Sequence, residues 1–227
     1  MSTINASELL RPGLLQGVSV MLAGAPAEPS ASQSLAGEVG AACAGLGARV
    51  LELALDGDTL DSASGEQTLE AAADRLLADG PGRLDLLVID GAGLFARALA
   101  AAGSDGRSAP ARLALRACLD ASWSVTHALV NRAFLSEGRG GRIVYLLPDG
   151  DAEYAAAARS GLENLARTLS IEWARHAITT VAVIPASGSA GEAARQVAAL
   201  TAYLASPAGA YFSGCLLDLR GLDAHRA

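Results

Sequence analysis

Three side chains in the second half of the sequence have the types that a proton-transferring site needs: Ser122, Tyr154 and Arg159. A phenol can donate and accept a proton, and a nearby cation favours its ionised form. Arg159 supplies a positive charge, but it stays protonated and presents a planar fork rather than a point charge. If the chain is an enzyme, we expect these three residues to form its site.

Five further positions are candidates for holding a nucleotide: Gly24, Ser30, Ser34, Asp56 and Asp90. A glycine lets the backbone approach a phosphate, and serine hydroxyls can donate hydrogen bonds to it. An acidic residue near the end of a second strand can hold a ribose. The structural alternatives are that a serine caps the next helix and that Asp56 belongs to a polar turn. We favour these structural alternatives.

The elements that would position these residues are alternating strands and helices. Apolar runs typical of strands covered on both faces occur at residues 18–23, 49–55, 84–89, 142–147, 179–184 and 215–219. Helical patterns occur at residues 35–46, 66–78, 111–136, 155–176 and 191–205. This alternation predicts a single α/β, doubly wound, Rossmann-like parallel sheet of about six or seven strands with helices on both faces. Ligands would bind at the carboxyl ends of its strands.

Composition fits one such domain. Of the 227 residues, 51% are hydrophobic and 4% aromatic, as in a compact folded chain. We expect a flexible N-terminal arm over residues 1–12 and one domain over residues 13–227. The net charge of −7 argues against a nucleic-acid partner. The sequence contains no apolar run of about 18 residues, so we expect no membrane span.

Neither a metal site nor secretion is expected. Cys43, Cys118 and Cys215 are far apart and odd in number, which is typical of reduced core thiols in a cytoplasmic protein. The three histidines lack the paired spacing of metal ligands. Residues 14–27 resemble a signal peptide with its cleavage site, but the sheet needs this apolar run as its first strand. We therefore expect a cytoplasmic location.

Six segments resemble one enzyme family in the correct order along nearly the whole chain. They are Gly47-ARVLEL, Leu84-DLLVIDGA, Gly140-GRIVYLL, Ser160-GLENL, Ile178-TTVAVIP and Ala210-YFSGCLLDLRG. Together they are similar to the motifs of the short-chain dehydrogenase/reductases. The resemblance implies a Rossmann-like fold, here shortened relative to typical members. In complete members it also implies an NAD(P) cofactor and oxidoreductase activity.

The resemblance implies a catalytic Asn, Ser, Tyr and Lys, and all four are replaced in this chain. The matching positions hold Ser122, Pro148, Ala155 and Arg159. The family's Tyr moves the proton, which an alanine cannot do. Tyr154 is adjacent, but one residue turns a helical side chain by about 100°. Tyr154 would then point away from the site unless the helix starts later, so we expect no catalytic residues.

The cofactor-binding features that the family resemblance implies are also altered. Of the loop glycines, Gly24 alone matches when the count runs forward from the first strand, with Glu28 and Ser30 at the next two positions. Counting backward from the end of the next helix places Ser34 and Ala36 there instead, so the loop carries an insertion. The acidic residue that holds the ribose matches Ala54. The segment before the third strand has room for one helix only, and no long lid follows Pro185. We therefore expect no cofactor, or NAD(P) if the chain is active after all.

These losses predict a catalytically inactive protein of this fold that acts as a structural or regulatory subunit of an oligomer. In the family, two long helices and the C-terminal strand form dimers and tetramers. The matching helices here are residues 111–136 and 155–176. Trp123 and Trp173 would anchor such contacts, or they would pack on the protein's own sheet. The partner would be a second copy or a catalytically complete relative.

Two alternatives to an inactive subunit remain open. The first is an active NAD(P)-dependent oxidoreductase with a relocated site formed by Tyr154, Arg159 and Ser122. The second is a module that binds a nucleotide or an acyl-CoA ester without any chemistry. Binding of NADH or NADPH would favour the first alternative, and binding of acyl-CoA alone would favour the second.

Overall fold

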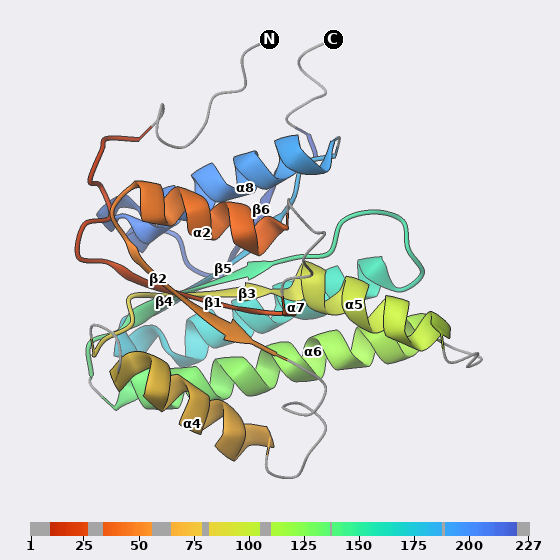
Figure 1. Cartoon of the computed structure of the whole chain (residues 1–227), viewed down its shortest axis with the longest axis horizontal. Coiled ribbons are helices and arrows are strands. Elements are labelled where there is room, and N and C mark those ends of the chain that lie inside the picture. The colour runs from red at the N-terminus through yellow and green to blue at the C-terminus, as the bar shows by residue number, and fades with distance from the viewer. Residues whose placement is uncertain are drawn as a thin grey trace.

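The computed structural model describes residues 10–26, 34–55, 65–78, 82–104, 110–136, 138–187 and 189–221. Six parallel strands form one sheet in the order β2-β1-β3-β4-β5-β6 (Figure 1). They are β1 (Ser19–Gly24), β2 (Arg49–Ala54), β3 (Leu86–Asp90), β4 (Gly141–Leu146), β5 (Ile178–Ile184) and β6 (Cys215–Asp218). The predicted doubly wound parallel sheet is confirmed, with six strands in the described part of the chain.

Helices cover both faces of the sheet (Figure 1). Two of them, α2 (Leu35–Gly45) and α8 (Ala190–Ala205), pack together on one face. On the other face lie α4 (Gly65–Ala78), α5 (Gly91–Ser104), α6 (Pro110–Leu129) and α7 (Ala155–Glu172). Each face has its own apolar cluster beneath its helices. The sheet therefore separates two cores.

The central strands carry the most buried sequence. Every residue of β1 and of β3 is buried, because helices cover both of their faces. The outer strands β2 and β6 leave several side chains partly or fully exposed. This gradient explains why the central strands are continuous apolar runs, as expected for a parallel sheet covered on both sides.

Helix α5 is not among the helices predicted from the sequence. It follows β3 without a loop, and Asp90 Oδ1 accepts a hydrogen bond from the Gly93 N–H at 2.9 Å. Glycines at positions 91 and 93 conceal the helical pattern, because glycine disfavours a helix. Gly91 is required by close packing, because a Cβ at this position would lie 2.5 Å from Leu162 Cδ1. The side chain of Phe95 is then buried in the core against α6 and α7.

The two long helices predicted at residues 111–136 and 155–176 are α-helical over only part of their lengths. Helix α6 ends at Leu129 and continues as a π-helical segment, Val130–Leu135. Helix α7 ends at Glu172, and a 3-10 turn, Ala174–His176, follows it. Both helices nevertheless lie side by side on one face of the sheet (Figure 1).

Two connections are short, as the sequence indicates. Between β2 and β3 the described residues form α4 and no further strand, so β2 is an edge of the sheet. Residues 185–189 alone join β5 to α8, and Ser189 caps that helix. The described residues of this connection form no helix or strand between β5 and α8.

Candidate functional site

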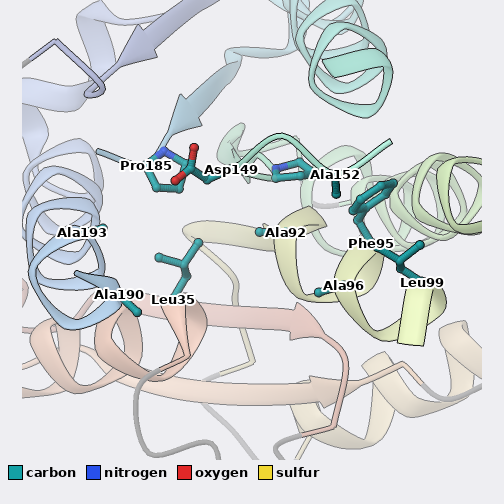
Figure 2. A pocket seen from close by; sticks show the side chains of 11 residues that line it. Leu35, Ala92, Phe95, Ala96, Leu99, Asp149, Ala152, Pro185, Ala190 and Ala193 are labelled. Atoms are coloured by element: carbon teal, nitrogen blue, oxygen red, sulfur yellow. The ribbon is translucent and has the colours of Figure 1, made fainter. Parts of the chain in front are cut away.

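A pocket of about 310 Å³ lies at the carboxyl ends of the strands, the edge where parallel sheets bind ligands (Figure 2). Its walls come from the starts of α2, α5 and α8 and from the segments after β4 and β5. The described residues that line it are Leu35, Ala92, Phe95, Ala96, Leu99, Pro148, Asp149, Ala152, Pro185, Ala190 and Ala193. Among them, only Pro148 is a position matched to a family site residue from the sequence.

The described lining of the pocket is apolar except for one carboxylate. Asp149 is the single charged residue among the described lining residues, and Figure 2 shows its side chain beside Pro185. No hydroxyl, phenol, thiol, imidazole or ammonium side chain belongs to this set. The described walls therefore provide apolar packing and one negative charge, but no side chain that donates a proton near neutral pH.

Three helices begin beside the pocket, and each start is capped by its own side chain. Ser34 Oγ accepts from the Gly37 N–H at 3.0 Å, Asp90 Oδ1 from the Gly93 N–H at 2.9 Å, and Ser189 Oγ from the Glu192 N–H at 3.3 Å. A free helix start attracts anions through such N–H groups. Side-chain oxygens already occupy one donor at each of these three starts. The N-cap interpretation of Ser34 is confirmed.

The positions matched to the family's Tyr and Asn are buried and lie outside the pocket lining. Ala155 begins α7 and is 0% exposed, and Ser122 on α6 is also 0% exposed. Burial raises the pKa of the adjacent Cys118 thiol to about 12, and the charge of Asp90 adds to this rise. The nearby Ser122 hydroxyl lowers the pKa of this thiol by less than burial raises it. Neither position can touch a ligand in the pocket.

Arg159 holds the segment that follows β4. Its Nη1 donates to the carbonyl oxygens of Pro148 at 3.2 Å and of Gly150 at 3.1 Å. Carbonyls in such a segment lack strand partners and need other donors. The guanidinium also contributes to lowering the pKa of Asp218, after the larger effect of Arg220. Arg159 therefore fastens α7 to the wall of the pocket that contains Pro148.

Tyr154 occupies a strained backbone position just before α7. Its φ of 63° lies in the left-handed region, which costs a non-glycine residue about 1–2 kcal/mol. The side chain is 41% exposed and does not belong to the described lining of the pocket. The helix does start one residue later, so the rotation of about 100° per residue does not set the direction of Tyr154.

Of the five candidate positions for holding a nucleotide, three lie within the described residues and two do not. Ser30 and Asp56 lie outside the described residues. Ser34 is the helix cap described above, while Gly24 and Asp90 end the adjacent strands β1 and β3. A Cβ on Gly24 would lie 2.9 Å from the Asp90 Cβ. The glycine therefore makes room for the Asp90 side chain, and neither residue lines the pocket.

Asp90→Asn is expected to stabilise the protein near neutral pH by about 1 kcal/mol, because it removes a buried charge and keeps an acceptor for the Gly93 N–H. Burial raises the pKa of Asp90 despite that hydrogen bond. A raised carboxyl pKa means that the charge costs nothing below the unfolded value of about 3.9, and its cost grows as the pH rises towards the folded value. Urea unfolding from acid to neutral pH measures the difference.

The advantage of Asp90→Asn should shrink as the pH falls towards the unfolded pKa. Asp151→Asn is the matched control, since Asp151 is exposed. A difference between Asp90→Asn and the wild type that stays constant across this pH range would contradict the prediction.

A second phenol lies in the interior, where it serves packing. Tyr145 on β4 is 0% exposed, and burial raises its pKa above the ordinary value. Thr126 Oγ1 donates to the Ser122 carbonyl at 2.6 Å, which leaves the Tyr145 hydroxyl to donate to Thr126 Oγ1 at 2.9 Å. The Tyr145 hydroxyl is therefore satisfied within the core, away from the pocket lining.

Among the described residues there is no group of three or more His, Cys, Asp or Glu side chains placed to hold a metal ion. The described helices also include none with the length and apolar character needed to cross a membrane.

The described residues at the strand ends lack the side chains that the family resemblance implies beside a nicotinamide, and residues 27–33, where its phosphates would lie, are outside the described part of the chain. The position that would present a phenol to the nicotinamide ribose holds the buried Ala155, and the Arg159 guanidinium is engaged with two carbonyl groups. The pocket itself carries the carboxylate of Asp149, whose charge disfavours phosphates.

No protein-family model and no curated protein sequence matches this chain. Solved structures do. A short-chain dehydrogenase from Mycobacterium smegmatis aligns with a TM-score of 0.70 at 21% identity over 96% of each chain. A hydroxysteroid dehydrogenase from Escherichia coli aligns with a TM-score of 0.69 at 17% identity, over 92% of this chain and 98% of that one.

A third such structure is an acetoin dehydrogenase from Salmonella typhimurium. It aligns with a TM-score of 0.63 at 23% identity, over 90% of this chain and 86% of that one. At these identities the likeness establishes a shared fold. The chain therefore has the fold of the short-chain dehydrogenases.

Proposed function

We propose that this chain is a catalytically inactive member of the short-chain dehydrogenase/reductase group, acting as a structural or regulatory subunit of a homo- or hetero-oligomer. The observation that carries the proposal is the burial of Ala155, which is 0% exposed. The group that moves the proton in the family must face the substrate. Here the matching position carries a methyl group that is packed inside the core.

The arrangement around α7 supports the same proposal. Arg159, at the family's lysine position, donates hydrogen bonds from its Nη1 to the carbonyl oxygens of Pro148 and Gly150. Pro148, at the serine position, has no hydroxyl. Ser122, at the asparagine position, is buried away from the pocket. None of these three positions holds the residue that the family uses there, which supports a subunit without catalysis.

The association surface that we propose is the outer side of α6 and α7, together with the segment around β6. Large apolar side chains are exposed on these elements: Leu113 and Trp123 on α6 are 39% and 44% exposed, Ile171 on α7 is 79% exposed, and Tyr211 before β6 is 92% exposed. The Trp123 ring stacks on His127 with centroids 5.5 Å apart. Exposed aromatic anchors of this kind dominate contact energies.

Trp173, the other candidate anchor, packs in part against the core beneath α6 and α7. It supports the alternative in which a tryptophan stabilises its own domain. Trp123 is therefore the stronger candidate for contact with a partner. That partner is a second copy of the chain or a catalytically complete relative.

The active-oxidoreductase alternative depends on Tyr154, which is exposed and precedes α7 in a strained conformation. Strain of this kind gathers at functional positions. The alternative requires Tyr154 to turn towards the strand ends, with Arg159 beside it and NAD(P) bound. Ser122 cannot take part without an opening of the α6 packing, since it is 0% exposed.

A cofactor titration tests the proposed function against both alternatives. NADH and NADPH are added to the purified full-length chain, and binding is followed by nicotinamide fluorescence and by heat. We expect no saturable binding at millimolar cofactor, because the described residues offer neither the phenol nor a free cation at the matched positions. An active short-chain dehydrogenase, titrated in parallel, is the positive control.

Saturable binding of NADH or NADPH, with reduction of a carbonyl compound that Tyr154→Phe abolishes, would establish the active alternative and overturn the proposal. Binding of an acyl-CoA ester without binding of either cofactor would instead identify the nucleotide-binding module. If neither NADH, NADPH nor an acyl-CoA ester binds, the proposed role in assembly remains, and measurement of the oligomeric state then tests it.

We also propose a cytoplasmic location as part of this function. The three cysteines are free thiols, and Cys43 and Cys118 are buried in separate cores. Their positions support a chain that folds without disulfides, as proteins of reducing compartments do.

A further inference from the structure

We propose that the pocket at the strand ends binds a small apolar amine, whose hydrocarbon part fills the cavity and whose ammonium group pairs with Asp149. The inference goes beyond the proposed function, since neither an assembly role nor the family's chemistry requires such a ligand. It stands on the size of the cavity, the chemistry of its described walls and the position of its one carboxylate.

The size of the pocket sets the size of the ligand. Its volume of about 310 Å³ is at the lower end of the range for small-molecule sites, about 300–1,000 Å³. An apolar cavity of about 150 Å³ is enough to bind benzene. The pocket at the strand ends therefore accommodates one ring with a short side chain, and it is too small to enclose a dinucleotide.

The described walls select for an apolar ligand body. Phe95, Leu99 and Leu35 bring large hydrocarbon groups from α5 and α2, and Pro185 lies across from Leu35 (Figure 2). Pro148 also lines the pocket. An apolar group that enters such a pocket gains free energy in proportion to the apolar surface that it removes from water. None of the described lining side chains offers a hydrogen-bond donor that would favour a polar ligand instead.

Asp149 gives the site its charge preference. The side chain lines the pocket, and it makes no hydrogen bond or ion pair with any described residue. Hydrogen bonds to Asp218 raise the pKa of the Arg220 guanidinium, and the nearby charge of Asp149 adds to this rise. Arg220 is nevertheless held by Asp218, with Nε and Nη2 at 2.9 and 2.6 Å from the two carboxylate oxygens. The Asp149 carboxylate therefore remains available to a cation in the pocket.

The helix starts around the pocket do not reverse this preference. They would favour an anion through free N–H groups. One of those groups at each start already bonds to the capping side chain of Ser34, Asp90 or Ser189. An anionic ligand would also meet the charge of Asp149. A cation on an apolar body suits both the walls and the carboxylate.

Three probes of the same shape and different charge test the proposal: phenethylamine, phenethyl alcohol and hydrocinnamate. Binding to the full-length chain is measured near neutral pH by calorimetry and by ligand-observed NMR. We expect the amine to bind about fivefold more tightly than the alcohol, the value of a partly exposed ion pair. The carboxylate should bind most weakly, because it places a second negative charge beside Asp149.

Two substitutions in the pocket lining, with one control substitution outside it, test whether the probes bind in this pocket. Asp149→Asn should remove the preference for the amine over the alcohol, while Asp151→Asn, an exposed neighbour outside the described lining, should keep it. Ala152→Leu should weaken both probes by filling the cavity from an exposed position that tolerates the change. Thermal unfolding of each variant verifies that it is folded.

Each other outcome overturns the proposal. No saturable binding of any probe shows that the cavity takes no such ligand. Equal binding of amine and carboxylate, or an amine preference that survives Asp149→Asn, shows that Asp149 does not select the ligand. These results are independent of the titration with NADH and NADPH, so the failure of this inference and the failure of the proposed function can be told apart.

Discussion

Restoring the family's residues, by Ala155→Tyr together with Arg159→Lys, is expected to destabilise the protein by about 3 kcal/mol and to produce no reductase activity. Ala155 is 0% exposed in the core beneath α7, so a tyrosine ring would displace packed neighbours. Lysine in place of Arg159 would lose the paired donation to two carbonyls. Urea unfolding and NADPH oxidation with a panel of carbonyl compounds measure both effects.

The matched control is Ala156→Tyr. Ala156 is the next residue on α7 and is exposed, so its substitution should change the free energy of unfolding by less than about 0.5 kcal/mol. A restored double variant that unfolds like the wild type and reduces a carbonyl compound would mean that the family's site is still open. The proposed loss of catalysis would then be wrong.

Ile171→Asp is expected to dissociate the oligomer, raising its dissociation constant by about thirtyfold or more, the effect of losing a central interface contact. Ile171 is 79% exposed in the single chain. A partner that covers α7 would bury this side chain, and an aspartate would then be a buried charge without a counterion. Light scattering during size-exclusion chromatography measures the mass across a dilution series.

Ala71→Asp is the control for the same charge change, since Ala71 is exposed on α4, outside the proposed surface. It should leave the mass unchanged. A wild-type chain that remains monomeric at the highest concentration would exclude the homo-oligomer. An oligomer that survives Ile171→Asp would exclude this part of α7 as the interface.

The sheet could be predicted from the sequence because its central strands are uninterrupted apolar runs. Val20–Ala23 and Leu86–Ile89 are buried on both faces, and such runs occur in few other folds. Helix α5 could not be predicted as readily, because Gly91 and Gly93 replace apolar residues at its start. The reason for Gly91 lies in the distant Leu162, which touches it only in the folded chain.

The candidate site was harder to predict than the fold. Of the four positions that the family resemblance points to, Pro148 lines the pocket, whereas Ser122, Ala155 and Arg159 do not. The pocket instead depends on how far α5 lies from the start of α8, and no local pattern encodes that separation. Asp149 carries no motif, and its relevance comes from its position beside Pro185 in space.

The direct connection of β5 to α8 by residues 185–189 has a kinetic consequence. Enzymes that commit a bound molecule to reaction close a mobile segment over it and release it slowly. With so short a link between β5 and α8, a molecule at the strand ends would not have to wait for that link to open before it leaves. The occupancy of the pocket would then stay in equilibrium with the surrounding ligand concentration, as in a binding site without turnover.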